Sequence, residues 1–262
     1  MAQTDQRDAA ATAPSAAPAA APAPGEVDES EKGRRVRGIF QKIARRYEMF
    51  NALSSLGIYR SWLGRVARLA ACEPTDRVID VAGGTGDVTF EVIRTCPPAS
   101  VELTDFTKEM LDVADEHIAA GAARGVPVRT RVADAMALPY EDDAFDVYTM
   151  AYGLRNFSDR ELSMREASRV LRPGGRYVAL EFSTPTNPAW RAVYNVYLGH
   201  VIPFVGGVLT HDRAGFDYLV SSIREFPPPA QIVRELEQSG FTSVTCHPCT
   251  GGIATIYVAR AR

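Results

Sequence analysis

The sequence contains little lysine, little cysteine and little net charge. Its basic residues are nearly all arginine, since lysine occurs only at Lys32, Lys42 and Lys108. The formal net charge is -3, and a chain without an excess of positive charge has no general affinity for a nucleic-acid backbone. Four cysteines are too few to form a disulfide scaffold in 262 residues. We therefore expect neither a nucleic-acid partner nor a disulfide framework.

Long apolar runs are also missing. No stretch reaches the roughly 18 residues of a membrane-spanning helix, and the N-terminus lacks the basic start and apolar core of a secretion signal. Asp5 and Asp8 lie where mitochondrial targeting peptides avoid acidic residues. These features favour a cytoplasmic protein.

The chain divides into a tail and one domain. Residues 1–33 are rich in alanine and proline and hold few large apolar residues. They cannot bury enough surface to offset the entropy lost on ordering, so we expect a disordered tail. Residues 34–262 are long enough for one large α/β domain. Its first part, 34–71, has the i, i+3, i+4 apolar spacing of two amphipathic helices, separated by a break at 51–57.

Short apolar runs alternate with helical patterns through the rest of the domain. Five strands are predicted, at 77–82, 101–104, 126–132, 145–151 and 177–182. Such alternation is typical of parallel β-α-β units in a doubly wound sheet. Two closing strands, near 242–247 and 253–260, are joined by a connection at Gly251 and Gly252 that is short enough to require a hairpin. One closing strand must therefore run antiparallel.

The first predicted strand ends in a glycine-rich turn. Asp80 in the strand is followed by Gly83, Gly84, Thr85 and Gly86, and a helical stretch begins directly afterwards. Glycine lets a backbone turn tightly and approach a ligand closely. The free amides at the start of the next helix suit a carboxylate. The turn is therefore a candidate cofactor site.

Polar residues follow the next two strands. Asp105 ends the second strand, and Asp134 and Ala135 follow the third. In doubly wound sheets ligands bind beyond these carboxyl ends, where an acidic side chain can accept ribose hydroxyls. The dinucleotide motif G-x-G-x-x-G, begun at Gly84, would need glycine at the position of Thr89. The pattern favours S-adenosylmethionine (SAM) over NAD, with an NAD dehydrogenase as the alternative.

Five longer stretches complete the pattern. They are FQKIARRYEMFNALSSLGIYRSW from Phe40, VIDVAGGTGDVTF from Val78, AYGLRNFSD from Ala151, RVLRPGGRYVALEFS from Arg169 and YLVSSIREFP from Tyr218. From Arg34 to the C-terminus the chain resembles the ubiquinone/menaquinone-biosynthesis C-methyltransferases. The resemblance implies an α/β, Rossmann-like class I SAM-dependent methyltransferase. We expect a mostly parallel seven-stranded sheet with an antiparallel closing strand, and N-terminal helices that form a lid.

The resemblance also implies a set of cofactor-binding residues. They are Thr85, Asp105, Asp134 and Ala135. The glycine-rich turn itself adds Asp80, Gly83, Gly84 and Gly86 to the predicted cofactor-binding residues. SAM is the expected cofactor, and no metal is implied. The chain departs from the family pattern at Glu48, where the family has aspartate, and at Tyr59, where it has histidine. These departures weaken a catalytic role for either position.

The implied reaction is methylation of a ring carbon in a prenylated quinol. The ring carbon is nucleophilic enough only if the neighbouring hydroxyl loses its proton. A phenol has a pKa of about 10, so ionising it at pH 7 requires about 4 kcal/mol of preferential stabilisation. Arg155, just beyond the fourth strand, is the candidate for this task, with Tyr152 and Asn156 beside it. The expected proton acceptor is a water held by Arg155, or a group near Tyr152 or residues 211–212.

The identity of the acceptor is less constrained. The resemblance implies demethylmenaquinol or a methoxy-polyprenyl-benzoquinol. A composition rich in alanine and arginine is typical of GC-rich actinobacteria, which make menaquinone, and favours demethylmenaquinol. Two alternatives are a methyltransferase for another small molecule, such as a sterol or polyketide, and a non-catalytic SAM-binding subunit.

Residues 190–209 carry aromatic and branched side chains interrupted by Pro203, Gly206 and Gly207. With the N-terminal helices, they are expected to cover the prenyl tail and to contact the membrane surface. The alternative is a helix packed on the sheet. The sequence leaves a homodimer open. A CxxC motif at 246–249 has no second pair of ligands and opens no helix, so we predict neither a zinc site nor a redox site there.

Overall fold

The computed structural model describes residues 30–47, 51, 55, 57–203 and 213–262. Most of the predicted tail, Glu48, and residues 204–212 lie outside the described residues. The hydroxyl of Ser30 accepts a hydrogen bond from the Gly33 amide and caps helix α1 (Glu31–Ile43). Helical structure thus begins before the expected domain boundary at residue 34.

A seven-stranded sheet has the order β3-β2-β1-β4-β5-β7-β6. The strands are β1 (Arg77–Val81), β2 (Ser100–Asp105), β3 (Val128–Val132), β4 (Phe145–Ala151), β5 (Leu171–Phe182), β6 (Phe241–Cys249) and β7 (Ala254–Ala261). Strands β1 to β5 pair in parallel, whereas β7 runs antiparallel to β5 and β6. The predicted Rossmann-like sheet and its antiparallel closing strand are confirmed. The strand order reverses at β1, where a doubly wound sheet opens its ligand crevice.

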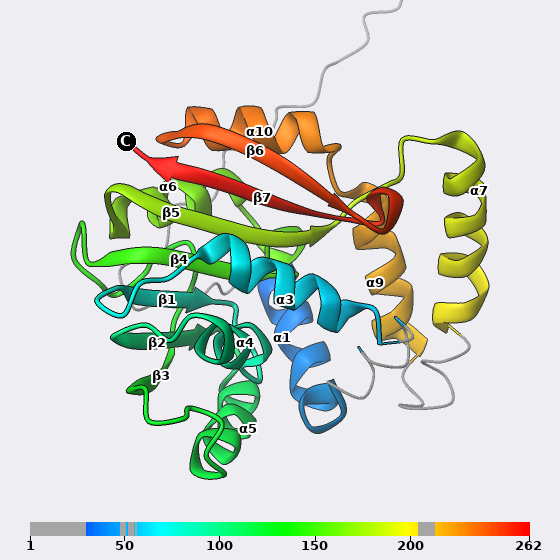
Figure 1. Ribbon diagram of the computed structural model, residues 1–262. Coiled ribbons are helices and arrows are strands. Elements are labelled where there is room, and N and C mark those ends of the chain that lie inside the picture. Colours follow the sequence, from blue (N-terminus) through cyan, green and yellow to red (C-terminus); the bar gives the residue numbers. More distant parts are fainter. Residues whose placement is uncertain (1–29, 48–50, 52–54, 56, 204–212) are drawn as a thin grey trace, which may run out of the picture.

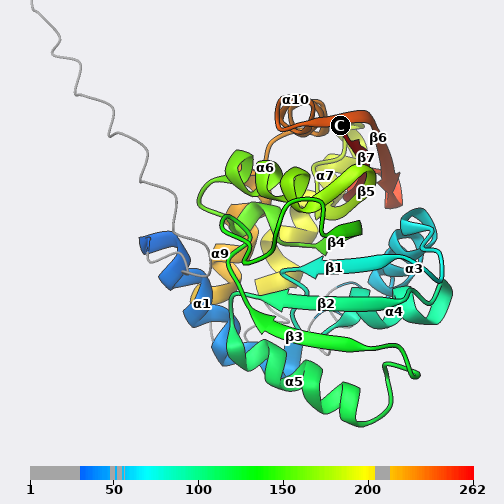
Figure 2. The ribbon, with the colours of Figure 1, turned by 90° about the vertical axis from the view of Figure 1, so that its left-hand side faces the viewer.

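Helices connect the strands and extend beyond one end of the sheet. They are α1, η1 (Ala44–Arg46), α3 (Tyr59–Ala70), α4 (Asp87–Thr95), α5 (Lys108–Ala119), η2 (Leu154–Asn156), α6 (Arg160–Val170), α7 (Pro188–Val196), η3 (Tyr197–Val201), α9 (Arg213–Glu225), α10 (Pro229–Gln238) and η4 (Thr250–Gly252). Helices α1, α7 and α9 lie beyond the carboxyl ends of the parallel strands (Figure 1). Figure 2 shows α1 past the arrowheads of β1, β2 and β3.

The two faces of the sheet are buried by different helices. Trp62 and Val66 of α3 and Val92 of α4 pack with Val78 of β1 in one cluster. On the other face, α6 and α10 cover a second cluster that includes Ile79 of β1, and α10 itself packs against β6 and β7 through residues such as Ile232. Near-continuous burial on both faces explains why the central strands are short apolar runs rather than alternating patterns.

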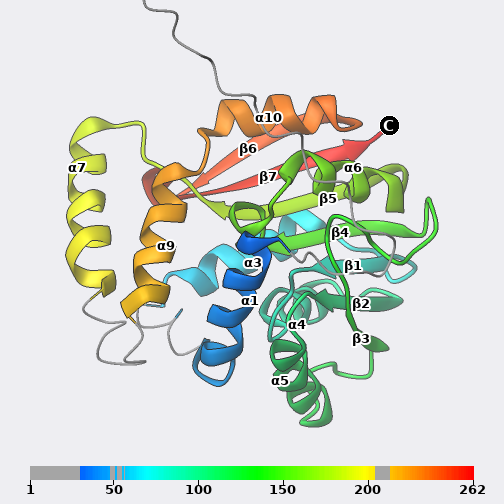
Figure 3. The same ribbon diagram turned by 180° about the vertical axis from the view of Figure 1, so that it is seen from behind.

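Helix α7 stands away from the sheet. Its inner side packs on α9, because Tyr194, Leu198 and Ile202 cluster with Val220 and Ile223. Figures 1 and 3 both show α7 as the outermost helix beside α9. Over the described residues 190–203, the segment thus packs mainly on α9, with Phe182 at the end of β5 beside the cluster, rather than on a face of the sheet. Within the described residues, no helix has the length and apolar character needed to cross a membrane.

Candidate functional site

A tight turn after β1 forms one wall of a cavity. Gly84 and Gly86 have φ angles of 58° and 94°, a region that glycine favours. Gly83 meets a spatial limit instead, because a Cβ there would overlap the Leu103 side chain and lie 2.9 Å from Asp80 Oδ2. The three predicted glycines are thus required by backbone conformation or by close packing.

Asp80 lies behind this turn. Its fully buried carboxylate accepts hydrogen bonds from Thr89 Oγ1 at 2.6 Å and from Thr149 Oγ1 at 2.9 Å. Burial raises the pKa of Asp80 to about 6, against the opposing effect of the two hydroxyls. Asp80 is absent from the residues that line the cavity. Its side chain therefore fixes β1 to α4 and β4, and so supports the turn from behind.

Asp105 faces the cavity from the end of β2. Its Oδ2 accepts the Gly84 amide at 2.9 Å and its Oδ1 accepts the Thr107 amide at 2.7 Å. Burial raises the pKa of Asp105 to about 6, partly offset by these backbone amides. The carboxylate is thus held rigidly against the turn while it faces the cavity.

The opposite wall follows β3. Asp134 is buried, and its Oδ1 accepts the Met136 amide at 2.8 Å.

Thr85, in the glycine-rich turn after β1, carries a buried hydroxyl that has no hydrogen-bond partner within the described part of the chain. A buried unpaired hydroxyl is costly, so a ligand that supplies its partner would be stabilised.

These walls border a cavity, here called the cofactor cavity. Of the predicted cofactor residues, those that line it are Gly83, Gly84, Thr85, Asp105, Asp134 and Ala135. Gly86 shapes the turn without lining the cavity. Helix α1 closes the cavity with Gly33, Val36 and Phe40, and Lys32 Nζ anchors this helix by donating to the Phe157 carbonyl at 2.5 Å.

A second cavity, here called the apolar channel, adjoins the first. Its lining is mainly aromatic and branched side chains from α1, α3, α7, η3 and α9. Six residues line both cavities, namely Phe40, Tyr47, Asn51, Tyr59, Tyr152 and Asn156. This shared group is the junction, where the contents of one cavity can meet those of the other.

Tyr152 occupies a strained position in the junction. Its φ is 61°, in the left-handed region that side chains other than glycine rarely adopt. Its ring stacks on Phe182 with centroids 4.6 Å apart. Burial raises the pKa of its hydroxyl well above the ordinary value. The hydroxyl is buried and finds no partner among the described residues, so it is a neutral group poised to donate a hydrogen bond.

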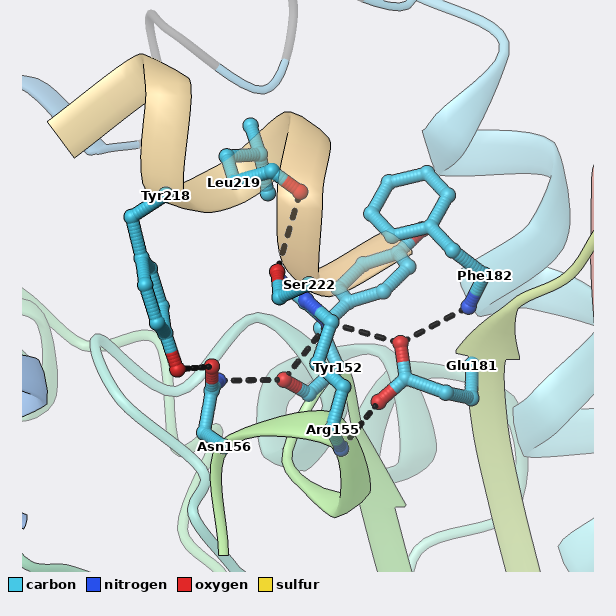
Figure 4. Close-up of polar contacts among 8 residues, drawn as sticks. All are labelled: Tyr152, Arg155, Asn156, Glu181, Phe182, Tyr218, Leu219 and Ser222. Atoms are coloured by element: carbon cyan, nitrogen blue, oxygen red, sulfur yellow. Dashed lines mark hydrogen bonds and ion pairs between the residues drawn. The ribbon is translucent and has the colours of Figure 1, made fainter. Parts of the chain in front are cut away.

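Arg155 lines the channel and is paired with a carboxylate (Figure 4). Its Nη1 lies 2.6 Å from Glu181 Oε1 and also donates to the Tyr152 carbonyl at 2.7 Å. Both side chains are buried, with exposed fractions of 5% for Arg155 and 1% for Glu181. The sequence predicted Arg155 as a cation for a phenolate, but the structure presents it as half of an ion pair. Its buried Nε has no partner among the described residues.

Asn156 connects this pair to α9. Its Nδ2 donates to the Tyr152 carbonyl at 3.0 Å, and its Oδ1 accepts the Tyr218 hydroxyl at 3.3 Å. Figure 4 shows Tyr218 reaching down from α9 toward Asn156. Tyr152, Arg155 and Asn156, predicted together, are thus brought together around one carbonyl.

A model of the ubiE/COQ5 methyltransferase family matches residues 28–261. The chain belongs to the ubiE/COQ5 methyltransferase family. It is therefore a SAM-dependent C-methyltransferase. The family resemblance proposed from the sequence is confirmed.

Two relatives of this methyltransferase cover most of its length. The ubiquinone/menaquinone biosynthesis C-methyltransferase UbiE of Dinoroseobacter shibae is 39% identical over 231 residues, which span 88% of this chain and 92% of that protein. The mitochondrial 2-methoxy-6-polyprenyl-1,4-benzoquinol methylase of Caenorhabditis elegans is 37% identical, over 88% of this chain and 81% of that protein.

Solved structures support the fold alone, because their sequence identity is low. The [4+2]-cyclase SpnF has a TM-score of 0.64 at 16% identity and covers 92% of this chain and 99% of its own. A SAM-dependent methyltransferase from Aquifex aeolicus has a TM-score of 0.53 at 16% identity, and the match covers 76% of this chain and 89% of that protein. The class I methyltransferase fold is shared, while the details of the methyltransferase's site rest on its own residues.

Sequence reasoning missed several residues of the methyltransferase's site. Glu181 and Tyr218 lie in the two C-terminal motifs that carried the resemblance, but neither was assigned a role. Tyr59 was discounted for departing from the family pattern, yet it lines both cavities with an exposed fraction of 4%. Tyr47 lies in the junction too, and burial raises its pKa to about 12.

The CxxC motif takes no part in the site. Cys246 packs with the cluster on one face of the sheet, and the buried Cys249 packs with the cluster on the other. Because the two thiols point to opposite faces of β6, they cannot form a local disulfide.

Proposed function

We propose that the cofactor cavity binds SAM and that the apolar channel holds a prenylated quinol, whose ring carbon is methylated at the junction. The observation that carries this proposal is the shared wall: the cofactor cavity, with the Asp105 and Asp134 carboxylates, and the apolar channel meet at Tyr47, Tyr59, Tyr152 and Asn156. A methyl donor and a lipid-like acceptor need such an arrangement, because their reacting atoms must come within near-attack distance.

The residues of the cofactor cavity fit SAM. Asp105 would accept the ribose hydroxyls, and Asp134 with Ala135 would flank the adenine. The Thr85 hydroxyl would gain the partner it lacks among the described residues, and Gly83 and Gly84, which line the cavity without side chains, would face the amino-acid end. When bound, SAM supplies a methyl group on a sulfonium, and the protein's own residues place the acceptor in line with it.

The acceptor's oxygens are expected to face Tyr152 and Arg155. Both residues line the channel and both carry a buried donor without a partner in the described part of the chain. Because Glu181 already neutralises Arg155, Arg155 acts as an oriented donor rather than as an isolated cation. Donors held in a site that excludes water stabilise developing phenolate charge strongly. Glu181 keeps the guanidinium in place.

Two head groups are candidates. Composition favours demethylmenaquinol, as argued above. The benzoquinol methylase from Caenorhabditis elegans favours a 2-methoxy-6-polyprenyl-benzoquinol as the second candidate. We also propose that the enzyme works from the cytoplasmic side at the membrane surface, because a polyprenyl acceptor resides in the bilayer.

Labelled methyl transfer tests the proposal. The purified protein is incubated with methyl-labelled SAM and, separately, with each reduced quinol. We expect label on a ring carbon of at least one quinol and none with the oxidised quinone, because only the quinol can form a phenolate. If neither quinol is labelled while calorimetry still shows SAM binding, the proposal of a prenylated quinol acceptor is refuted. Methyl transfer to another small molecule would then be the remaining function.

A further inference from the structure

The apolar channel reaches the protein surface at one rim. Ile58, Trp190 and Val193 line the channel and are also exposed, with exposed fractions of 42%, 37% and 56%. They come from the start of α3 and from α7, two segments far apart in the sequence. The rim is therefore the opening through which a long tail can enter.

Exposed apolar side chains gather around this opening. Six large apolar residues are exposed in the described part of the chain, and three of them, Ile58, Trp190 and Val193, also line the channel. Val196 and Val201, with exposed fractions of 60% and 41%, extend the patch along α7 and η3. Only Val132, on β3, lies elsewhere among the six. The inner side of α7 is already buried on α9, so this helix is apolar on both sides.

The two segments that carry the rim residues hold basic but no acidic side chains. No acidic residue occurs in 57–72 or in 183–203 of the sequence. The same segments expose Arg60, Arg191 and His200. In a chain whose net charge is negative, a rim without acidic residues favours an anionic surface.

We propose that this apolar rim, formed by Ile58, Trp190, Val193, Val196 and Val201, docks on an anionic lipid bilayer so that the channel opens into the acyl layer. A prenyl tail then passes from lipid into the channel without crossing water. An apolar helix face flanked by basic residues has the character of an interfacial membrane-binding element. The purpose of docking rests on the proposed function, but docking itself can be measured without any quinol.

Vesicle binding tests the rim directly. The double variant Val196→Asp/Val201→Asp changes two rim residues that do not line the channel. We expect the wild-type protein to sediment with phosphatidylcholine vesicles that contain phosphatidylglycerol, and less with phosphatidylcholine alone. The double variant should lose about tenfold or more of this binding. Val132→Asp is the matched control, an exposed valine on β3, and should bind as wild type does.

Turnover separates docking from catalysis. The double variant should keep wild-type turnover of a short, tail-free quinol in solution and lose turnover of a prenylated quinol embedded in vesicles. Equal vesicle binding by wild type and double variant would overturn the proposal. A second outcome would also overturn it: the wild-type protein binds no vesicles and is a dimer, whereas the double variant is a monomer. The rim would then be a subunit interface. If the wild-type protein binds vesicles but methylates none of the quinols, only the proposed function is refuted.

Discussion

Arg155, which lines the apolar channel, forms a buried ion pair with Glu181, with Nη1 2.6 Å from Oε1. The pair comes from η2 and the end of β5, two segments that the parallel β4–β5 pairing brings together. Glu181 also accepts the Phe182 amide at 2.7 Å and the Arg155 amide at 3.2 Å. These hydrogen bonds hold the Glu181 carboxylate in one position, and the carboxylate in turn holds the Arg155 guanidinium in position.

Glu181→Gln should disturb catalysis more than cofactor binding. The substitution leaves the buried guanidinium without its counter-charge, which costs about 3–5 kcal/mol of stability in typical proteins. A misplaced guanidinium should lower kcat/KM for the quinol by about a hundredfold. The SAM dissociation constant should stay unchanged, because Glu181 does not line the cofactor cavity. Steady-state kinetics and calorimetry measure both quantities.

Glu235→Gln is the control for that variant. Arg160 Nη2 lies 3.0 Å from Glu235 Oε1, and Glu235 is largely buried, but neither residue lines a cavity. We expect a lower melting temperature and unchanged kcat/KM at a temperature where both variants are folded. Equal loss of activity in the two variants would mean that Glu181 acts through stability alone.

Tyr152→Phe should lower turnover without lowering stability. The Tyr152 hydroxyl is buried and lacks a partner among the described residues, so its removal relieves an unsatisfied group. If it donates to a developing phenolate, its loss should reduce kcat by about tenfold to a hundredfold. Tyr257→Phe removes another such hydroxyl, on β7 and outside both cavities, and should leave kcat unchanged. Wild-type kcat in Tyr152→Phe would exclude the hydroxyl from the reaction.

The fold was predictable because its sequence patterns are local. Each central strand is an apolar run followed by a polar residue or glycine, so the cofactor residues at strand ends, such as Asp105 and Asp134, could be found from the sequence. The hairpin at 250–252 fixed the antiparallel strand for the same reason.

The partners of Arg155 were not predictable in this way. Glu181 is separated from it by 26 positions, and its contact depends on the register between β4 and β5. The position of α7 depends on packing against α9 rather than on its own apolar pattern, which fits a sheet contact equally well. Asp80 resembled a cofactor ligand because the sequence cannot tell which side of a turn a strand residue faces.

SAM binding should weaken as the pH falls through about 6. The folded-state pKa of Asp105 is raised to about 6 by burial, above its ordinary value. Folding therefore favours the protonated form, and the Asp105 contribution to stability falls as pH rises through this range. Ribose hydroxyls would bind the ionised form, so affinity should be full above pH 6 and decline below it. Calorimetry across this range measures the decline, and Asp105→Asn should abolish both tight binding and its pH dependence.

Gly83→Ala should distort the cofactor cavity by displacing the turn that forms its wall. A Cβ at Gly83 would overlap Leu103 and lie 2.9 Å from Asp80 Oδ2, and these neighbours are buried and cannot yield. We expect SAM affinity to fall by at least about tenfold. Gly38→Ala, in α1 with no atom within 4 Å of the new Cβ, should keep wild-type affinity and gain about 0.5–1 kcal/mol of stability. Wild-type SAM affinity in Gly83→Ala would place the cofactor outside this turn.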